Sequence, residues 1–144
     1  MHSTCFVCGK KNCSGLGISY SLDENGHVKG TFCISANYVD ATGMCHRGII
    51  LTLLDSAMVH TLLQRNISGL TAKLSVRFLK PIPIGECVEI SAQIVDRQRE
   101  LYYMTGTVFS GETVYAVGSA TFFADVRSVE PEDSFSSTLD QGQG

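Results

Sequence analysis

Residues 45–64 of the chain read CHRGIILTLLDSAMVHTLLQ. Ten of the fifteen residues from 49 to 63 are apolar, and this part of the stretch contains neither proline nor glycine. The pattern predicts a helix from about Arg47 to Gln64. Because apolar side chains occupy most of its circumference, this helix must be largely surrounded by the rest of the protein. It nevertheless carries one carboxylate, Asp55.

The remainder of the chain predicts strands. Residues 16–22 and 27–35 form a predicted hairpin around Asn25-Gly26. Apolar and polar residues then alternate in most of four further segments, which cover residues 71–80, 87–96, 101–110 and 113–124. The connections between these segments are too short for a parallel crossover, so we expect neighbours along the chain to pair antiparallel. We therefore predict an α+β fold, with one long central helix wrapped by a curved antiparallel sheet of about six strands.

The composition fits one globular domain. The chain has 144 residues, a net charge of −3 and 44% hydrophobic residues. We expect a cysteine-containing N-terminal segment (1–14), a domain over residues 15–126 and a disordered polar tail (127–144). No basic run indicates nucleic acid as a partner, and no apolar stretch reaches the ~18 residues that span a membrane. The start lacks the apolar core of a signal peptide, so we expect a cytoplasmic protein.

The six cysteines fall into two groups. Cys33, Cys45 and Cys87 are scattered, and without an export signal we expect them to act as small hydrophobic residues rather than as a disulfide framework. The N-terminal segment carries an H-x2-C-x2-C-x4-C run, formed by His2, Cys5, Cys8 and Cys13. Four such ligands can build a tetrahedral zinc site. The run is very short, however, so we favour a turn packed by small residues and expect no metal.

Asp55 has mostly apolar neighbours on the predicted helix. The residues three, four and seven positions away are Leu51, Thr52, Met58, Val59 and Leu62. Burying an unpaired carboxylate among them would be costly, and Asp55 is too far from the helix start to cap it. A catalytic carboxylate and a structural aspartate that bonds to a neighbouring strand explain its position equally well.

The predicted helix start is a candidate oxyanion site. The sequence there is His46-Arg47-Gly48, and backbone N–H groups at a helix start lack partners within the helix and can hold a developing negative charge. Gly48 would also let a ligand approach closely. An oxyanion site and a carboxylate together point to acyl transfer or hydrolysis.

The two features are too far apart to act on one carbonyl within one subunit. Eight residues separate Arg47 from Asp55, which is roughly 12 Å along a helix. The attacked carbon needs both groups within about 3 Å. If both are catalytic, the oxyanion donor comes from a second copy, which predicts a two-fold dimer with antiparallel helices.

Three segments resemble a known family. HRGIILTLLD (46–55) resembles the HGG-x-x-x-x-x-x-D signature of hotdog-fold thioesterases of the PaaI-like acyl-CoA thioesterase group. CFVCGKKNCSGLGI (5–18) is similar to the C-x-x-C-G…N-x-x-G-L start of many members, and RFLKPIPIGECVEISAQIV (77–95) resembles their strand, turn and strand after the helix. The resemblance covers about residues 5–125. It implies a hotdog fold, dimers that often pair into tetramers, and hydrolysis of acyl-CoA without a metal, a cofactor or a serine triad.

The resemblance also implies roles for individual residues. Asp55 falls on the family's catalytic carboxylate, which acts as nucleophile or as general base. His46 falls on the motif histidine, which orients the loop or bonds near the thioester. Arg47 falls on the first glycine of the motif, whose N–H binds the thioester oxygen, and Gly48 falls on the second. Thr71 falls where relatives can carry a hydroxyl that helps hold the attacking water.

This chain departs from the family at Arg47. Its backbone N–H survives, but the side chain adds bulk and charge that could contact a CoA phosphate or block the usual substrate. Asp40 stands where some relatives place an amide. Lys73, Arg77 and Lys80 are candidates for CoA phosphates, although solvated strand faces explain them equally well. A non-catalytic acyl-CoA binding module is the alternative function.

Overall fold

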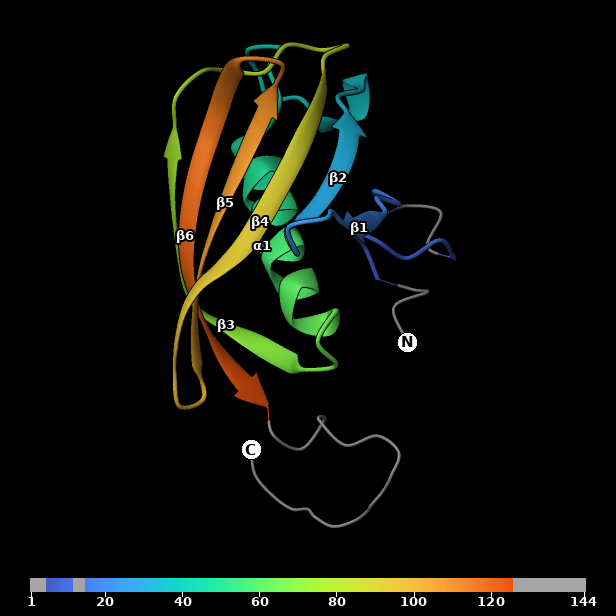
Figure 1. The fold of residues 1–144 in the computed structure, drawn as a ribbon. Coiled ribbons are helices and arrows are strands. Elements are labelled where there is room, and N and C mark those ends of the chain that lie inside the picture. The colour runs from blue at the N-terminus through green and yellow to red at the C-terminus, as the bar shows by residue number, and fades with distance from the viewer. Residues whose placement is uncertain (1–4, 12–14, 126–144) are drawn as a thin grey trace.

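The computed structural model describes residues 5–11 and 15–125. Six strands form a single antiparallel sheet that curves around one long helix, as the sequence predicts (Figure 1). In chain order, the elements are β1 (Tyr20–Leu22), β2 (Val28–Cys33), a 3-10 turn η1 (Ala36–Tyr38), α1 (Arg47–Leu63), β3 (Ser68–Phe78), β4 (Cys87–Gln98), β5 (Leu101–Ser110) and β6 (Thr113–Asp125). His2, Cys13 and the tail at 127–144 lie outside the described residues.

The order of the strands differs from the order along the chain. The sheet runs β1-β2-β4-β5-β6-β3, so β3 pairs with β6 and not with β4. The expectation that neighbours along the chain pair is therefore wrong for these two strands. The connector at residues 79–86 passes over the end of the curved sheet (Figure 1) instead of turning back as a hairpin. Ile82 anchors it, because its side chain is buried and its carbonyl accepts a hydrogen bond from Cys45 N–H at 2.8 Å.

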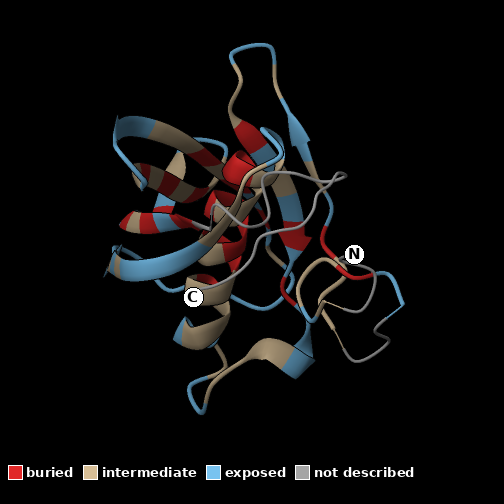
Figure 2. Cartoon of the chain, turned by 90° about the horizontal axis from the view of Figure 1, so that it is seen from below, coloured by how far each residue is buried: buried red, intermediate tan, exposed pale blue. Residues whose placement is uncertain are grey.

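The core lies between α1 and the concave face of the sheet, where the buried residues gather (Figure 2). The largest fully buried side chains include Leu53, Leu54, Met58 and Leu62 of α1, with Val88, Ile90, Met104, Val108 and Phe122 of the sheet. Each such side chain stabilises the folded state by about 1.5–3 kcal/mol relative to exposure. Every second residue of a strand faces the helix and contributes to this core. The same alternation identified the strands in the sequence.

Two glycines let α1 lie directly on the sheet. Gly106 of β5 and Gly118 of β6 are directly paired, on the face toward the helix. A Cβ on Gly106 would lie 3.0 Å from Leu54 Cδ2 and 3.1 Å from Met58 Cε, and a Cβ on Gly118 would lie 3.3 Å from Leu54 Cδ1. Leu54 therefore occupies the space that two ordinary side chains would fill.

A disulfide joins Cys33 of β2 to Cys87 of β4, which are paired in the strand register. Both residues are exposed, so the expectation that they act as small hydrophobic residues without a disulfide is wrong. The reason is the strand alternation: Phe32 and Val88, which are next to them in the chain, point inward, so the cysteines point outward. Cys45 does behave as expected, because it is buried in the core.

Within the described part of the chain, no helix is long and apolar enough to cross a membrane.

Replacing Gly106 by alanine should destabilise the protein by about 1–3 kcal/mol, because the added methyl group overpacks the contact with Leu54. The carbonyl oxygen of Ser91 lies 3.1 Å from the same point and, being backbone, cannot rotate away. Gly118→Ala should cost less, since its nearest contact is longer. Urea unfolding of both variants tests this. Equal stability of Gly106→Ala and the wild type would show that the helix is not held this closely.

Candidate functional site

Asp55 lies at the boundary between α1 and β3. Its Oδ1 accepts a hydrogen bond of 2.6 Å from the Thr71 hydroxyl. Leu51 and Val59, one turn away on either side, are half-buried like Asp55 itself, whereas Met58 is fully buried. The carboxylate is thus paired and only partly covered. The contact fits the expected structural aspartate, and it equally fits a carboxylate held ready for chemistry.

A β-bulge turns Thr71 toward Asp55. Thr71 pairs with Phe122 of β6, but Lys73 pairs with Thr121, so Ala72 is the extra residue in β3. Paired residues share a face of the sheet, and Thr71 therefore lies on the helix side together with the buried Phe122. Without the bulge, alternation would place Thr71 on the outer face with Lys73.

At the start of α1, the backbone N–H of Arg47 is left available. His46 is the N-cap, and its Nδ1 accepts a 2.8 Å hydrogen bond from Gly48 N–H. The His46 carbonyl accepts from the N–H groups of Ile49 and Ile50, at 3.0 and 3.4 Å. Among the described residues, no acceptor bonds to the N–H of Arg47. Of the first four donors of the helix, this one remains for a ligand.

Gly48 makes room for the histidine cap. A Cβ at this position would lie 3.0 Å from His46 Nδ1 and 3.1 Å from His46 Cε1. Since Nδ1 accepts the bond from Gly48, a neutral His46 carries its proton on Nε2. The structure therefore gives Gly48 a role in positioning His46.

The Arg47 side chain lines a cavity of about 260 Å³ beside the helix start, together with Asp40 and Lys80. Its guanidinium carbon lies 5.7 Å from the centroid of the Phe78 ring, which is within the range of a cation–π contact. Asp40 accepts hydrogen bonds from the Thr42 hydroxyl at 2.5 Å and the Thr42 N–H at 2.8 Å. These bonds, and the nearby Arg47 charge, hold the pKa of Asp40 below its ordinary value.

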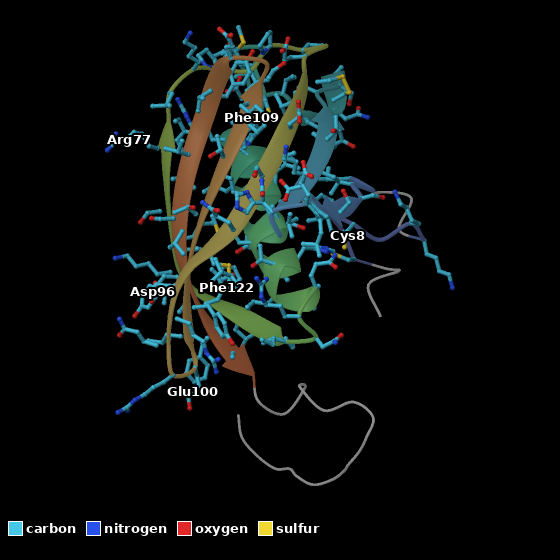
Figure 3. The ribbon with its side chains drawn as sticks, in the orientation of Figure 1. Cys8, Arg77, Asp96, Glu100, Phe109 and Phe122 are labelled. Carbon is cyan, nitrogen blue, oxygen red and sulfur yellow. A yellow bond between two sulfur atoms is a disulfide. The ribbon has the colours of Figure 1, made fainter. Side chains whose placement is uncertain are left out.

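The predicted site residues thus form two clusters and leave two residues outside. His46, Arg47, Gly48 and Lys80 gather at the helix start, and Asp55 with Thr71 lies near the middle. Lys73 and Arg77 belong to neither cluster. Both are exposed on the outer face of β3, and Arg77 points away from α1 (Figure 3).

The sequence did not single out Phe78 as the partner of the Arg47 side chain. The two residues are separated by most of α1 and β3, and no local pattern connects a cation to an aromatic ring so far along the chain.

A further polar group packs on α1 from the side of β1. The Tyr20 hydroxyl donates to the carbonyl of Leu53 at 3.2 Å, and the Tyr20 ring lies 4.7 Å from the His60 ring, centroid to centroid. Burial raises the pKa of Tyr20 far above its ordinary value, an effect that a hydrogen bond with Ser56 only partly offsets. Tyr20 sits over Gly30, where a Cβ would lie 2.8 Å from its ring. This residue ties β1 to the helix at Leu53, two residues before Asp55.

Solved structures similar to this chain share its fold. A thioesterase superfamily protein superimposes with a TM-score of 0.75 at 22% sequence identity, covering 81% of this chain and 61% of the other. A hypothetical thioesterase protein of Streptococcus pneumoniae, solved with coenzyme A, gives 0.70 at 20% identity, with 74% of this chain and 87% of the other covered. The same pneumococcal protein has been solved as an aspartate-to-alanine and as a threonine-to-alanine variant, and the threonine follows the aspartate by sixteen positions.

Sequence comparison points the same way. The chain is 26% identical over 128 residues to the acyl-coenzyme A thioesterase THEM4 of Bos taurus. The match takes in 83% of this chain but spans only half the length of that relative. The family model described as the thioesterase superfamily matches residues 42–127, which include the helix start, Asp55, Thr71 and strands β3 to β6. With more than half of its length matched by that model, the chain belongs to the thioesterase superfamily.

Proposed function

We propose that the protein hydrolyses an acyl-CoA thioester, with Asp55 acting on the attacking side and the backbone N–H of Arg47 binding the carbonyl oxygen. The observation that carries this proposal is the hydrogen bonding at the helix start, where the Gly48, Ile49 and Ile50 donors are used and that of Arg47 is not. Such a donor, held in place before the reaction, stabilises the oxyanion as it forms. The acyl-CoA thioesterase name of the bovine relative and the coenzyme A bound to the pneumococcal neighbour support the substrate class.

Thr71 leaves one carboxylate oxygen of Asp55 for chemistry. Its hydroxyl holds Oδ1 at 2.6 Å, and no hydrogen bond to Oδ2 is formed among the described residues. As general base, Oδ2 would take a proton from water while the water oxygen attacks the carbonyl carbon. The C–S bond then breaks, and the departing CoA thiolate takes up a proton. As nucleophile, Oδ2 would itself attack the carbonyl carbon. The C–S bond would break and release the CoA thiolate, leaving an anhydride that water hydrolyses.

The pairing of an aspartate with a threonine also has a parallel in the pneumococcal protein. Asp55 and Thr71 are sixteen positions apart, as are the aspartate and the threonine replaced in that protein's variants. We take this shared spacing as support for a joint role of the two residues.

A second copy of the chain would complete the site. The 17-residue helix is continuous from Arg47 to Leu63, so the N–H of Arg47 and Asp55 remain roughly 12 Å apart along it. Beside Asp55 runs β3, an 11-residue strand at the edge of the sheet, with Leu70 61% exposed. An edge of this length offers backbone groups for pairing with another chain. We propose a two-fold dimer in which the Arg47 of one subunit faces the Asp55 of the other.

Asp55→Asn should keep the fold and lower hydrolysis by on the order of a hundredfold or more. The amide oxygen can still accept the bond from Thr71, so the melting temperature should be unchanged or slightly higher. The measurement is a screen over acyl-CoAs of different length and aromaticity with a thiol-reactive dye, alongside thermal unfolding.

Thr71→Val is the matched control, because it removes the hydrogen bond and keeps the carboxylate. If Asp55 were only a structural tie, Asp55→Asn would remain active and Thr71→Val would lose stability without a specific loss of rate. A wild type that binds CoA esters tightly but hydrolyses none would instead establish the alternative of a non-catalytic binding module.

Arg47→Pro tests the oxyanion donor directly. Arg47 is the first residue of α1, a position that tolerates proline, and the preceding His46 has the extended backbone (φ −61°, ψ 135°) that proline requires of its neighbour. The substitution removes the N–H and should reduce kcat by on the order of a hundredfold. Arg47→Gly removes the same side chain but keeps the N–H, so it should retain hydrolysis and accept bulkier acyl groups. Equal activity of the two variants would refute the assignment.

Mixing the two inactive variants tests the shared site. If Arg47 and Asp55 act across a dimer interface, refolding Asp55→Asn with Arg47→Pro should give heterodimers in which one site is intact, restoring about a quarter of the wild-type activity. Light scattering should show at least a dimer. A mixture that stays inactive, or a fully active monomer at micromolar concentration, would contradict the dimer.

A further inference from the structure

Cys5 and Cys8 lie in a compact turn of the N-terminal segment. Both are half-exposed thiols in the structure, and the turn is closed by a 2.9 Å hydrogen bond from Gly9 N–H to the Cys5 carbonyl. Figure 3 shows Cys8 on the N-terminal segment, on the side of the molecule that carries β1.

The turn is fixed to the domain at several points. The carbonyls of Phe6 and Val7 accept hydrogen bonds from the N–H groups of Leu16 and Ile18, at 2.6 and 2.8 Å. Lys10 Nζ donates to the Gly17 carbonyl at 2.6 Å. Val7, Cys8 and Leu16 also pack against the hydrophobic core. The two sulfur atoms are therefore held in a defined arrangement.

The surroundings give the two thiols different reactivity. Burial acts to raise the pKa of Cys5. This effect is outweighed by hydrogen bonds to its sulfur, which come from the N–H groups of Cys8, Val7 and Gly9 and from the Cys8 thiol. The pKa of Cys5 therefore lies below its ordinary value. The pKa of Cys8 is raised to about 11. Burial is the largest cause, followed by the hydrogen bond to Cys5 and the negative charge of Cys5. Cys5 is thus the better nucleophile, with Cys8 beside it as a second thiol.

We propose that Cys5 and Cys8 form a reactive dithiol site that reduces low-molecular-weight disulfides and closes to a Cys5–Cys8 disulfide. The Cys5 thiolate attacks one sulfur of the small disulfide, whose S–S bond breaks and releases one thiolate. Cys8 then loses its proton to that thiolate and attacks Cys5, releasing the second small thiol. Two electrons pass from the pair to the small disulfide, and each step is a thiol–disulfide exchange.

The dithiol lies close enough to Tyr20 for its charge to act on that side chain. Charge on Cys8, on Cys5 and on Asp55 each acts on Tyr20 in the direction that raises its pKa, and the Tyr20 hydroxyl bonds the helix at Leu53. The site itself does not depend on the proposed hydrolase activity.

The test uses the full chain with Cys13→Ser, which removes the third N-terminal cysteine. With iodoacetamide at neutral pH, Cys5 should be alkylated at least about tenfold faster than Cys8 or the buried Cys45. After treatment with oxidised glutathione, the mass should fall by two hydrogen atoms, and peptide mapping should find Cys5 linked to Cys8. Alkylation of Cys5 no faster than Cys45 would overturn the proposal.

Variants separate the attacking role of Cys5 from the resolving role of Cys8. In Cys8→Ser, the mixed disulfide of Cys5 with glutathione should persist because no second thiol resolves it, whereas Cys5→Ser should leave Cys8 slow to react. Cys45→Ser is the control and should change neither result. The dithiol assignment would also be overturned by a lasting mixed disulfide in the chain that retains Cys8. It would equally be overturned by one zinc ion per chain that a chelator must remove before Cys5 reacts.

Discussion

Leu54 fits into the gap that Gly106 and Gly118 leave in the sheet, and this contact sets how closely α1 approaches the strands. Asp55, the next residue of the helix, is consequently brought to the boundary with β3, where a hydroxyl as short as that of Thr71 reaches it at 2.6 Å. Larger residues at the two glycine positions would hold the helix farther away. The contact that packs the core thus also positions the carboxylate.

Local sequence patterns predicted the elements well because their causes are local. The helix was expected from Arg47 to Gln64 and ends at Leu63, and alternation identified every strand after it. Strand pairing was not predictable in the same way. That β3 joins β6 depends on the curvature of the whole sheet and on a buried Ile82 in the connector, which no short window of sequence contains.

The sequence supplied candidate residues for the site but not their geometry. The family resemblance pointed to His46, Arg47, Asp55 and Thr71 as candidates, but alternation alone would have placed Thr71 on the outer face. Only the bulge at Ala72 turns it inward, and a bulge is a property of two paired strands. For the same reason, the outward pairing of Cys33 with Cys87 was missed, since it depends on which strand lies beside β2.

The Cys33–Cys87 disulfide also gives the chain a distinctive connectivity. The two residues are 54 positions apart, and the covalent loop between them contains all of α1, all of β3, both candidate clusters and the Arg47 cavity from Asp40 to Lys80. In the chain-entropy model, a loop of this length removes about 4 kcal/mol of conformational freedom from the unfolded state. With the disulfide formed, unfolding of this segment is therefore less favourable than it would be with noncovalent contacts alone. Strands β5 and β6 lie outside the loop and have no such restraint.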